Sequence, residues 1–325
     1  MTASAWPPPA VKLPALAAGA ARPYSYYHDL AEERLQRYFE RGLERASRSP
    51  GARLWRLYQS GETVGLALLE PLTWDTQVLS RQAARLGALL AAGDYHAALR
   101  RKQQLLDGVL DEARRRGVVH LAARVPAEDL AGLHALESRG FETLDAIVTS
   151  GQRVEKGPAG LPEGVRLARP ADLAVLRRLA AASFRYDRYH ADSTIPAAVA
   201  DHLHAEWIEN SVRGLADAVL VAEAPGEPGT PAGFLTLKVD PEAEILGTSI
   251  ATIVLVATAR ECRGQGLGRR LTEAAVVWCR AHAIERVEVG TQLRNIPAGR
   301  LYAAAGFGLL AASLSLRWAA GGRCP

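Results

Sequence analysis

A glycine-rich segment, Arg263-Gly264-Gln265-Gly266-Leu267-Gly268, has the composition of an anion-binding turn. It follows the apolar run 250–257 and opens a stretch, 269–281, in which apolar residues recur at helical spacing. Its glycines let a ligand approach the backbone closely. The first amides of a helix have no intrahelical partner and carry partial positive charge. The pattern therefore predicts a strand, a turn and a helix start that cradle a phosphate, with nearby arginines adding charge.

Two better-known phosphate loops are excluded by one position. A Walker loop requires a lysine directly after its last glycine, and the residue after Gly268 is Arg269. A dinucleotide-binding loop beginning at Gly264 requires a third glycine at the position that Arg269 occupies. The segment therefore predicts a phosphate site of another kind.

A second group of residues, about one helix and one strand downstream, could supply acid chemistry. Asn295 can cap a helix start, and Tyr302 follows it along the same predicted helix. A phenol with a pKa of about 10 can protonate a leaving thiolate whose thiol has a pKa of about 8.5. Taken alone, Tyr302 is more typical of an amphipathic core residue.

Together the two motifs resemble the signatures of the GNAT superfamily of acyl-CoA N-acyltransferases. Residues 263–268 resemble its Arg-x-x-Gly-x-Gly/Ala pyrophosphate loop. Its second signature, Asn-x-x-Ala, then Tyr, then Gly-Phe, is matched by Asn295, Ala298, Tyr302, Gly306 and Phe307. The resemblance implies an α/β fold of the α+β type, a mixed β-sheet flanked by helices, with acetyl-CoA as cosubstrate and Tyr302 protonating the CoA thiolate. The implied cofactor contacts are Leu255, Val256, Ala257, Arg263, Gly264, Gln265, Gly266, Leu267, Gly268, Arg269 and Asn295.

Further segments are similar to the bacterial TDP-fucosamine N-acetyltransferase group, whose members acetylate the amine of a nucleotide-linked 4-amino sugar. They are residues 188–192, residues 206–214 and Thr291-Gln292. The similarity is good over residues 176–318 and patchy before them. It implies acetyl transfer to a nucleotide-linked amino sugar. The alternatives are another small-molecule or peptide amine as acceptor, and a non-catalytic acyl-CoA-binding protein.

The general base is not evident from the sequence. Many GNAT enzymes carry Asp or Glu on the strand before the loop, and residues 246–260 contain neither. An amine that is already neutral, with water to carry its proton away, needs less help. The fallback bases are Asp187, His190, His204 and Glu209. Residues 184–192 and 207–210 are the predicted acceptor pocket, although its tryptophan is more typical of a core residue.

The chain is predicted to contain two related lobes. Aligning Gly140-Phe141 with Gly306-Phe307 superposes a strand and a helix of each half, but places Asp129 at the position of Asn295 and Leu136 at that of Tyr302. The first lobe therefore keeps the fold and lacks the cofactor site. The predicted boundaries are an extension at 1–25, a degenerate GNAT-like lobe at 26–150, a linker at 151–163, the catalytic GNAT domain at 164–319 and a tail at 320–325.

Composition is that of a globular protein, with 325 residues, 48% hydrophobic, 23% charged and a net charge of +4. This small excess does not call for a nucleic-acid partner. Three cysteines without a C-x-x-C pair favour neither a disulfide framework nor a zinc site and suit a reducing cytoplasm. Neither a secretory signal nor a membrane span is expected. The resemblance also implies a possible homodimer.

Overall fold

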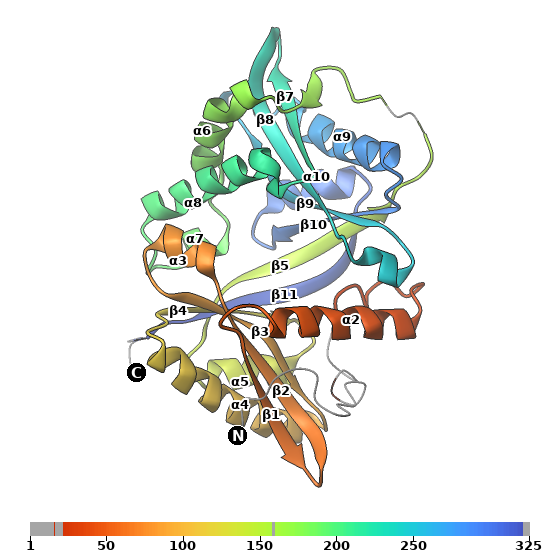
Figure 1. The fold of residues 1–325 in the computed structure, drawn as a ribbon. Helices are drawn as coiled ribbons and strands as arrows, with labels where there is room; N and C mark the ends of the chain where they lie inside the picture. The colour runs from red at the N-terminus through yellow and green to blue at the C-terminus, as the bar shows by residue number, and fades with distance from the viewer. Residues whose placement is uncertain (1–15, 17–21, 158–159, 321–325) are drawn as a thin grey trace. The chain divides into compact units, whose positions relative to one another are not determined.

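The computed structural model describes residue 16, residues 22–157 and residues 160–320. Most of the predicted extension and nearly all of the predicted tail therefore lie outside the described residues. The chain divides into two compact units, formed by residues 1–146 with 312–325 and by residues 147–311. In each unit helices cover a mixed β-sheet, which agrees with the predicted fold class (Figure 1).

The described residues of the first unit include the strands on one side of the sheet order. In sheet order they are β1 (Arg53–Gln59), β2 (Glu62–Pro71), β3 (Ala83–Ala91), β4 (His120–Pro126) and the end of β11 (Gly308–Trp318). Its helices are α2 (Glu32–Ser47), α3 (Thr73–Leu79), α4 (Tyr95–Arg115) and α5 (Leu130–Glu137). Because side chains alternate along a strand, Ala67 and Leu69 of β2 join the core beneath α4 and α5, while Leu66 and Leu68 join the core beneath α2.

The second unit carries the predicted site. Its strands, in sheet order, are residues 147–153 of β5 (Glu142–Arg153), β10 (Arg286–Gln292), β9 (Ile250–Thr258), β8 (Glu227–Val239), β7 (Ala218–Ala224) and β6 (Val165–Leu167). Its helices are α6 (Leu173–Ser183), α7 (Arg188–Ala191), α8 (Ala197–Asn210), α9 (Leu267–Ala281) and α10 (Ile296–Ala304). Short turns of helix cover Pro170–Asp172, Ser211–Leu215, Ala243–Leu246 and Arg260–Cys262.

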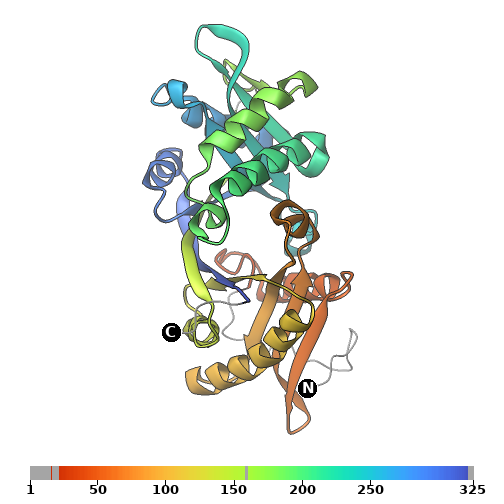
Figure 2. The same cartoon turned by 90° about the vertical axis from the view of Figure 1, so that its left-hand side faces the viewer.

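Two separate cores hold this second sheet between its helices. Leu176 of α6 and Ile208 of α8 pack with strand residues in one core, and Leu271 and Trp278 of α9 pack in the other. Figures 1 and 2 show α6 and α8 on one face of this sheet and α9 on the opposite face. The sheet is therefore buried on both sides, as its nearly continuous apolar strands require.

Each unit is completed by a strand from the other half of the sequence. Residues 147–153 of β5 pair with β10 in the second unit. Residues 313–318 of β11 pair with β4 in the first. The observed division thus differs from the predicted one, because Gly151–Arg153, assigned to a linker, are strand, and residues 312–318, assigned to the catalytic domain, belong to the first sheet.

The order of elements repeats within the chain. In the first unit β3 leads through α4 to the parallel strand β4 and then to α5. In the second, β9 leads through α9 to the parallel strand β10 and then to α10. This repeat agrees with the predicted alignment of the halves.

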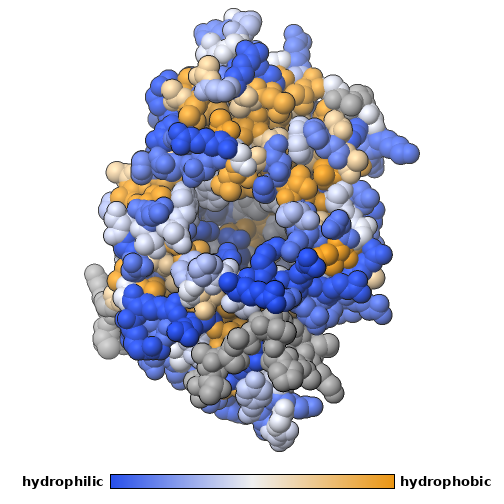
Figure 3. All heavy atoms as spheres, in the orientation of Figure 1, coloured by the Kyte–Doolittle hydropathy of each residue, from blue (hydrophilic) through white to orange (hydrophobic). Residues whose placement is uncertain are grey.

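The described residues contain no helix long and apolar enough to cross a membrane. On the face drawn in Figure 3, hydrophilic residues are interspersed with smaller hydrophobic areas.

Candidate functional site

The predicted phosphate loop joins β9 to α9. Gly264 and Gly266 adopt φ values of +76° and +80°, in the left-handed region that favours glycine. Gly266 is also the N-cap of α9 and makes no side-chain capping bond. A Cβ placed on Gly264 or Gly266 would meet nothing within 4 Å. The loop therefore presents the amides at the start of α9 to open space, as an anion site requires.

The side chains of this loop divide into anchors and exposed groups. Leu267 is buried in the core beneath α9, and a Cβ on Gly268 would lie 3.2 Å from Leu301 of α10. These two positions hold the helix start against its neighbours. Arg269 is exposed and donates to Glu273 one turn along α9, at 2.8 Å. Arg263 and Gln265 are exposed beside the loop.

A β-bulge in β9 precedes the loop. Leu235 of β8 pairs with Val256 and Leu237 pairs with Ile253, so two residues of β9 lie opposite the single residue Thr236. The bulge reverses the faces of the strand: Ile253 packs beneath α9, whereas Leu255 packs beneath α6 and α8.

The bulge also decides which amide of β9 can meet a ligand. The Leu255 amide donates to Thr236 Oγ1 at 3.0 Å and the Ala259 amide donates to Ala232 at 2.7 Å, both toward β8. Because successive amides of a strand alternate in direction, the Val256 amide points the opposite way, toward the β10 side.

On that side β9 parts from its neighbour. The parallel pairing runs from Ile250 with Arg286 to Ile253 with Val289. Beyond it β10 continues with β5 as its partner, through residues 290–292. The Val256 amide therefore lies along the edge where β9 and β10 diverge. Of the three predicted contacts on β9, Leu255 and Ala257 contribute buried side chains, and Val256 contributes the outward amide.

Asn295 and Tyr302 lie on α10, as predicted. Asn295 caps the helix, and its Oδ1 accepts from the Ala298 amide at 3.3 Å. Tyr302 is 5% exposed, and its ring centroid lies 5.9 Å from that of Phe307. Burial raises the pKa of Tyr302, so its hydroxyl keeps its proton across the neutral range. Tyr302 is thus a buried core residue that keeps its proton, and its acid role stays a prediction.

The corresponding positions of the first unit are filled by the chain itself. Asp94 caps α4, and its Oδ1 accepts from the Ala97 amide at 2.8 Å. Asp129 caps α5 as Asn295 caps α10, and Lys102 Nζ lies 2.5 Å from Asp129 Oδ1. The N-terminus of α4, which corresponds to the open N-terminus of α9, is therefore occupied by the Asp94 carboxylate. The position that corresponds to Asn295 holds Asp129 in an ion pair with Lys102.

On the predicted acceptor side, aromatic rings stack around His204. Its ring centroid lies 4.4 Å from that of Phe184 and 6.2 Å from that of Trp207. Trp207 packs against the core beneath α8, which supports the core interpretation of this residue. Burial lowers the pKa of His204.

The fallback bases are all engaged by other groups. Both carboxylate oxygens of Glu209 are in ion pairs, with Arg177 and Arg213. His190 contacts Asp187 through Nδ1 at 2.6 Å and Asp201 through Nε2 at 3.0 Å. Asp187 also caps α7.

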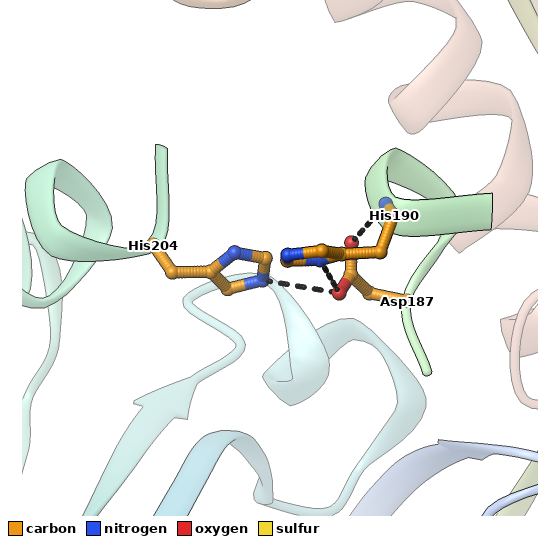
Figure 4. Close-up of side chains that lie close together, drawn as sticks. All are labelled: Asp187, His190 and His204. Carbon is orange, nitrogen blue, oxygen red and sulfur yellow. Dashed lines mark hydrogen bonds and ion pairs between the residues drawn. The ribbon is translucent and has the colours of Figure 1, made fainter. Parts of the chain in front are cut away.

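Two features escaped the sequence analysis. Arg294 donates to the Tyr186 carbonyl at 2.9 Å, which ties the acceptor loop to the residue before Asn295. Asp187, His190 and His204 form one cluster (Figure 4). The spacing of Asp187 and His190, three residues apart, was the available signal for the cluster; the sequence held none for the position of Tyr186.

The chain is similar to known proteins in sequence and in fold. Residues 177–307 match the model of the Acetyltransferase (GNAT) family. The chain is 30% identical over 185 residues to dTDP-fucosamine acetyltransferase of Escherichia coli O6:H1, covering 57% of this chain and 75% of that protein. It is 26% identical over 262 residues to the spore coat polysaccharide biosynthesis protein SpsD of Bacillus subtilis strain 168, covering 77% and 82% of the two chains.

A solved tandem GNAT protein from the clavulanic acid biosynthesis pathway shares the fold. It has a TM-score of 0.53 and 17% identity, and 84% of each chain is covered. This chain belongs to the acetyltransferase (GNAT) family, as the sequence motifs predicted. Its enzymes use acetyl-CoA as the cosubstrate, and this one acetylates an amine.

Proposed function

We propose that this enzyme transfers the acetyl group of acetyl-CoA to the amino group of a nucleotide-linked amino sugar. The observation that carries the cofactor part is the uncapped N-terminus of α9 directly after the diverging edge of β9. The acceptor part is supported by the name of the Escherichia coli relative, a dTDP-fucosamine acetyltransferase, and by that of SpsD, a polysaccharide biosynthesis protein.

The residues present fit acetyl-CoA. The amides of Gln265 to Arg269 would hold its pyrophosphate, because the first amides of α9 have no intrahelical partner at its positive end and Gly264 and Gly266 leave room for the ligand. Arg263 would add a charged donor beside them. Leu255, Val256 and Ala257 would line the pantetheine arm, and the Val256 amide would bond the thioester carbonyl.

In this mechanism the amine nitrogen attacks the thioester carbonyl carbon and the carbon–sulfur bond breaks. The Val256 amide would stabilise the negative oxygen of the tetrahedral intermediate, as oxyanion donors do. Tyr302 would give its phenolic proton to the departing thiolate. Burial raises the pKa of Tyr302, which keeps the phenol protonated before the reaction but widens its gap from the thiol pKa, so the transfer would have to be coupled to the thiolate charge that develops as the carbon–sulfur bond breaks. The proton of the amine would leave through water, because the fallback bases are engaged elsewhere.

The test is release of free thiol from acetyl-CoA with a TDP-4-amino sugar as acceptor. Turnover in the wild type, with a loss of about 100-fold or more in Tyr302→Phe and unchanged acetyl-CoA binding, supports both the acceptor and the acid. Turnover with other small amines or peptides but not with the nucleotide sugar would move the acceptor to another class. Acetyl-CoA binding without turnover on any amine would refute the proposed reaction.

A further inference from the structure

Asp187, His190 and His204 bring three metal-ligating atoms together where α7 meets α8 (Figure 4). Their ligand atoms all lie within 4.8 Å of one another. Asp187 Oδ2 lies 2.6 Å from His190 Nδ1 and 3.8 Å from His204 Nε2. The side chains of His190 and His204 are 7% and 2% exposed. The reaction proposed above makes no use of this cluster.

The ring of His204 is fixed by the backbone. Its Nδ1 lies 2.8 Å from the Ala200 carbonyl oxygen, which only accepts hydrogen bonds, so Nδ1 carries the hydrogen. In the neutral ring the lone pair is then on Nε2, which faces Asp187 Oδ2. A backbone carbonyl that holds the far nitrogen is the usual outer partner of a metal-binding histidine.

His190 is fixed by a carboxylate in the same way. Its Nε2 lies 3.0 Å from Asp201 Oδ1. When Nε2 donates to Asp201, the lone pair of the neutral ring is on Nδ1, only 2.6 Å from Asp187 Oδ2. Two acceptors at this distance repel each other unless a cation lies between them. Arg185 also lies 3.2 Å from His190 Nε2 and donates to the same Asp201 oxygen at 2.5 Å. Because a guanidinium only donates, its contact with Nε2 favours the other tautomer, in which Nδ1 donates to Asp187, and a bound ion would then replace that hydrogen.

We propose that Asp187, His190 and His204 bind a divalent transition-metal ion of the zinc type. Two imidazoles and one carboxylate are a preferred ligand set for zinc, and three protein ligands leave a fourth position open. Tetrahedral ligands at about 2.0–2.1 Å from the ion are about 3.3 Å apart. The observed separations of 2.6 and 3.8 Å straddle that value. The bound ion would hold the short helix α7 against α8, because its ligands come from both.

The test is a zinc titration of chelator-treated protein, with bound metal counted by mass spectrometry after gel filtration. We expect one zinc ion per chain and a higher thermal midpoint with zinc. His204→Gln and Asp187→Asn should each abolish binding. The matched control is His202→Gln on the same helix, because the His202 side chain is 58% exposed and lies outside the cluster. Asp201→Asn, which removes an outer partner, should weaken binding by about 10–100-fold.

Circular dichroism and acetyl-CoA binding establish that each variant is folded. Wild-type protein that takes up less than a tenth of an equivalent of zinc would overturn the proposal. So would unchanged binding in both cluster variants. A nitrogen-15 spectrum of zinc-saturated protein could show that both His190 nitrogens carry protons. A proton, and not a zinc ion, would then lie between His190 and Asp187, which would also overturn the proposal. No acceptor substrate is needed, so the result is independent of the proposed acetyl transfer.

Discussion

The Leu255 amide donates a 3.0 Å hydrogen bond to Thr236 Oγ1, across the bulge that turns the next amide, that of Val256, outward. Thr236 is fully buried, so no water replaces this acceptor when it is removed. The bond therefore links the shape of β9 to the amide that would bind the thioester.

Thr236→Val should leave the Leu255 amide unsatisfied and destabilise the protein by about 1–3 kcal/mol. Because the bulge would also relax, we expect kcat to fall more than the KM for acetyl-CoA rises. Thr236→Ser keeps the oxygen and should retain most activity. Steady-state kinetics and urea unfolding measure both effects, and equal kinetics in the valine and serine variants would contradict this role.

Gly266→Ala should weaken acetyl-CoA binding. A residue with a Cβ at a φ of +80° is strained by about 1–2 kcal/mol, and the added carbon would take up part of the open space that the proposed pyrophosphate site needs. We expect the KM for acetyl-CoA to rise by about tenfold, the equivalent of about 1.4 kcal/mol. Gly226→Ala is the matched control, since Gly226 has a φ of +78° in the turn between β7 and β8. Its variant should lose similar stability with an unchanged KM.

Asp172→Asn should destabilise the second unit in a pH-dependent way. Hydrogen bonds from Arg166, at 2.7 and 3.0 Å, lower the pKa of Asp172 despite its burial. A carboxyl whose pKa is lowered on folding contributes stability above its ordinary pKa of about 4 and loses it as the pH falls below.

At neutral pH we expect the free energy of unfolding of Asp172→Asn to be lower than that of wild type by about 1.5–3 kcal/mol, the range for hydrogen bonds to a charged group. The difference from wild type should shrink as the pH falls below about 4. Thermal unfolding midpoints between neutral and acid pH measure it. Asp111→Asn serves as control because the Asp111 side chain is 72% exposed in its pair with Arg114, and exposed pairs contribute little. A constant difference across the pH range would argue against the ion pair.

Tyr302 should give the opposite pH dependence. Burial raises its pKa, so the folded chain keeps the phenolic proton where the unfolded chain has lost it. Its contribution is complete below the ordinary pKa of about 10 and is lost as the pH rises above it. We expect the free energy of unfolding of Tyr302→Phe to decline less steeply above about pH 10 than that of wild type. Tyr58→Phe is the control, because Tyr58 is 56% exposed and should leave the decline unchanged.

Much of the fold was predictable from local pattern. The apolar run 250–257, the helical stretch 269–281 and the helix through Tyr302 are observed as β9, α9 and α10. Glycines at positions that need a positive φ, and apolar residues at helical spacing, can be recognised in the sequence because each pattern depends only on residues within one turn or helix. The pairing of β5 with β10 and of β11 with β4 was not predictable, because the residue types within a strand do not show which distant strand it pairs with.

The site divides in the same way. The sequence by itself determined the glycine-rich turn before α9, the capping Asn295 and the position of Tyr302, because each depends on residue types at fixed spacing along one strand or helix. Only the tertiary structure decided that the Val256 amide, and not that of Leu255 or Ala257, faces the diverging edge, because the direction depends on a bulge formed with Thr236 of another strand. It alone also placed His204 of α8 beside Asp187 and His190, since packing between helices brings these side chains together.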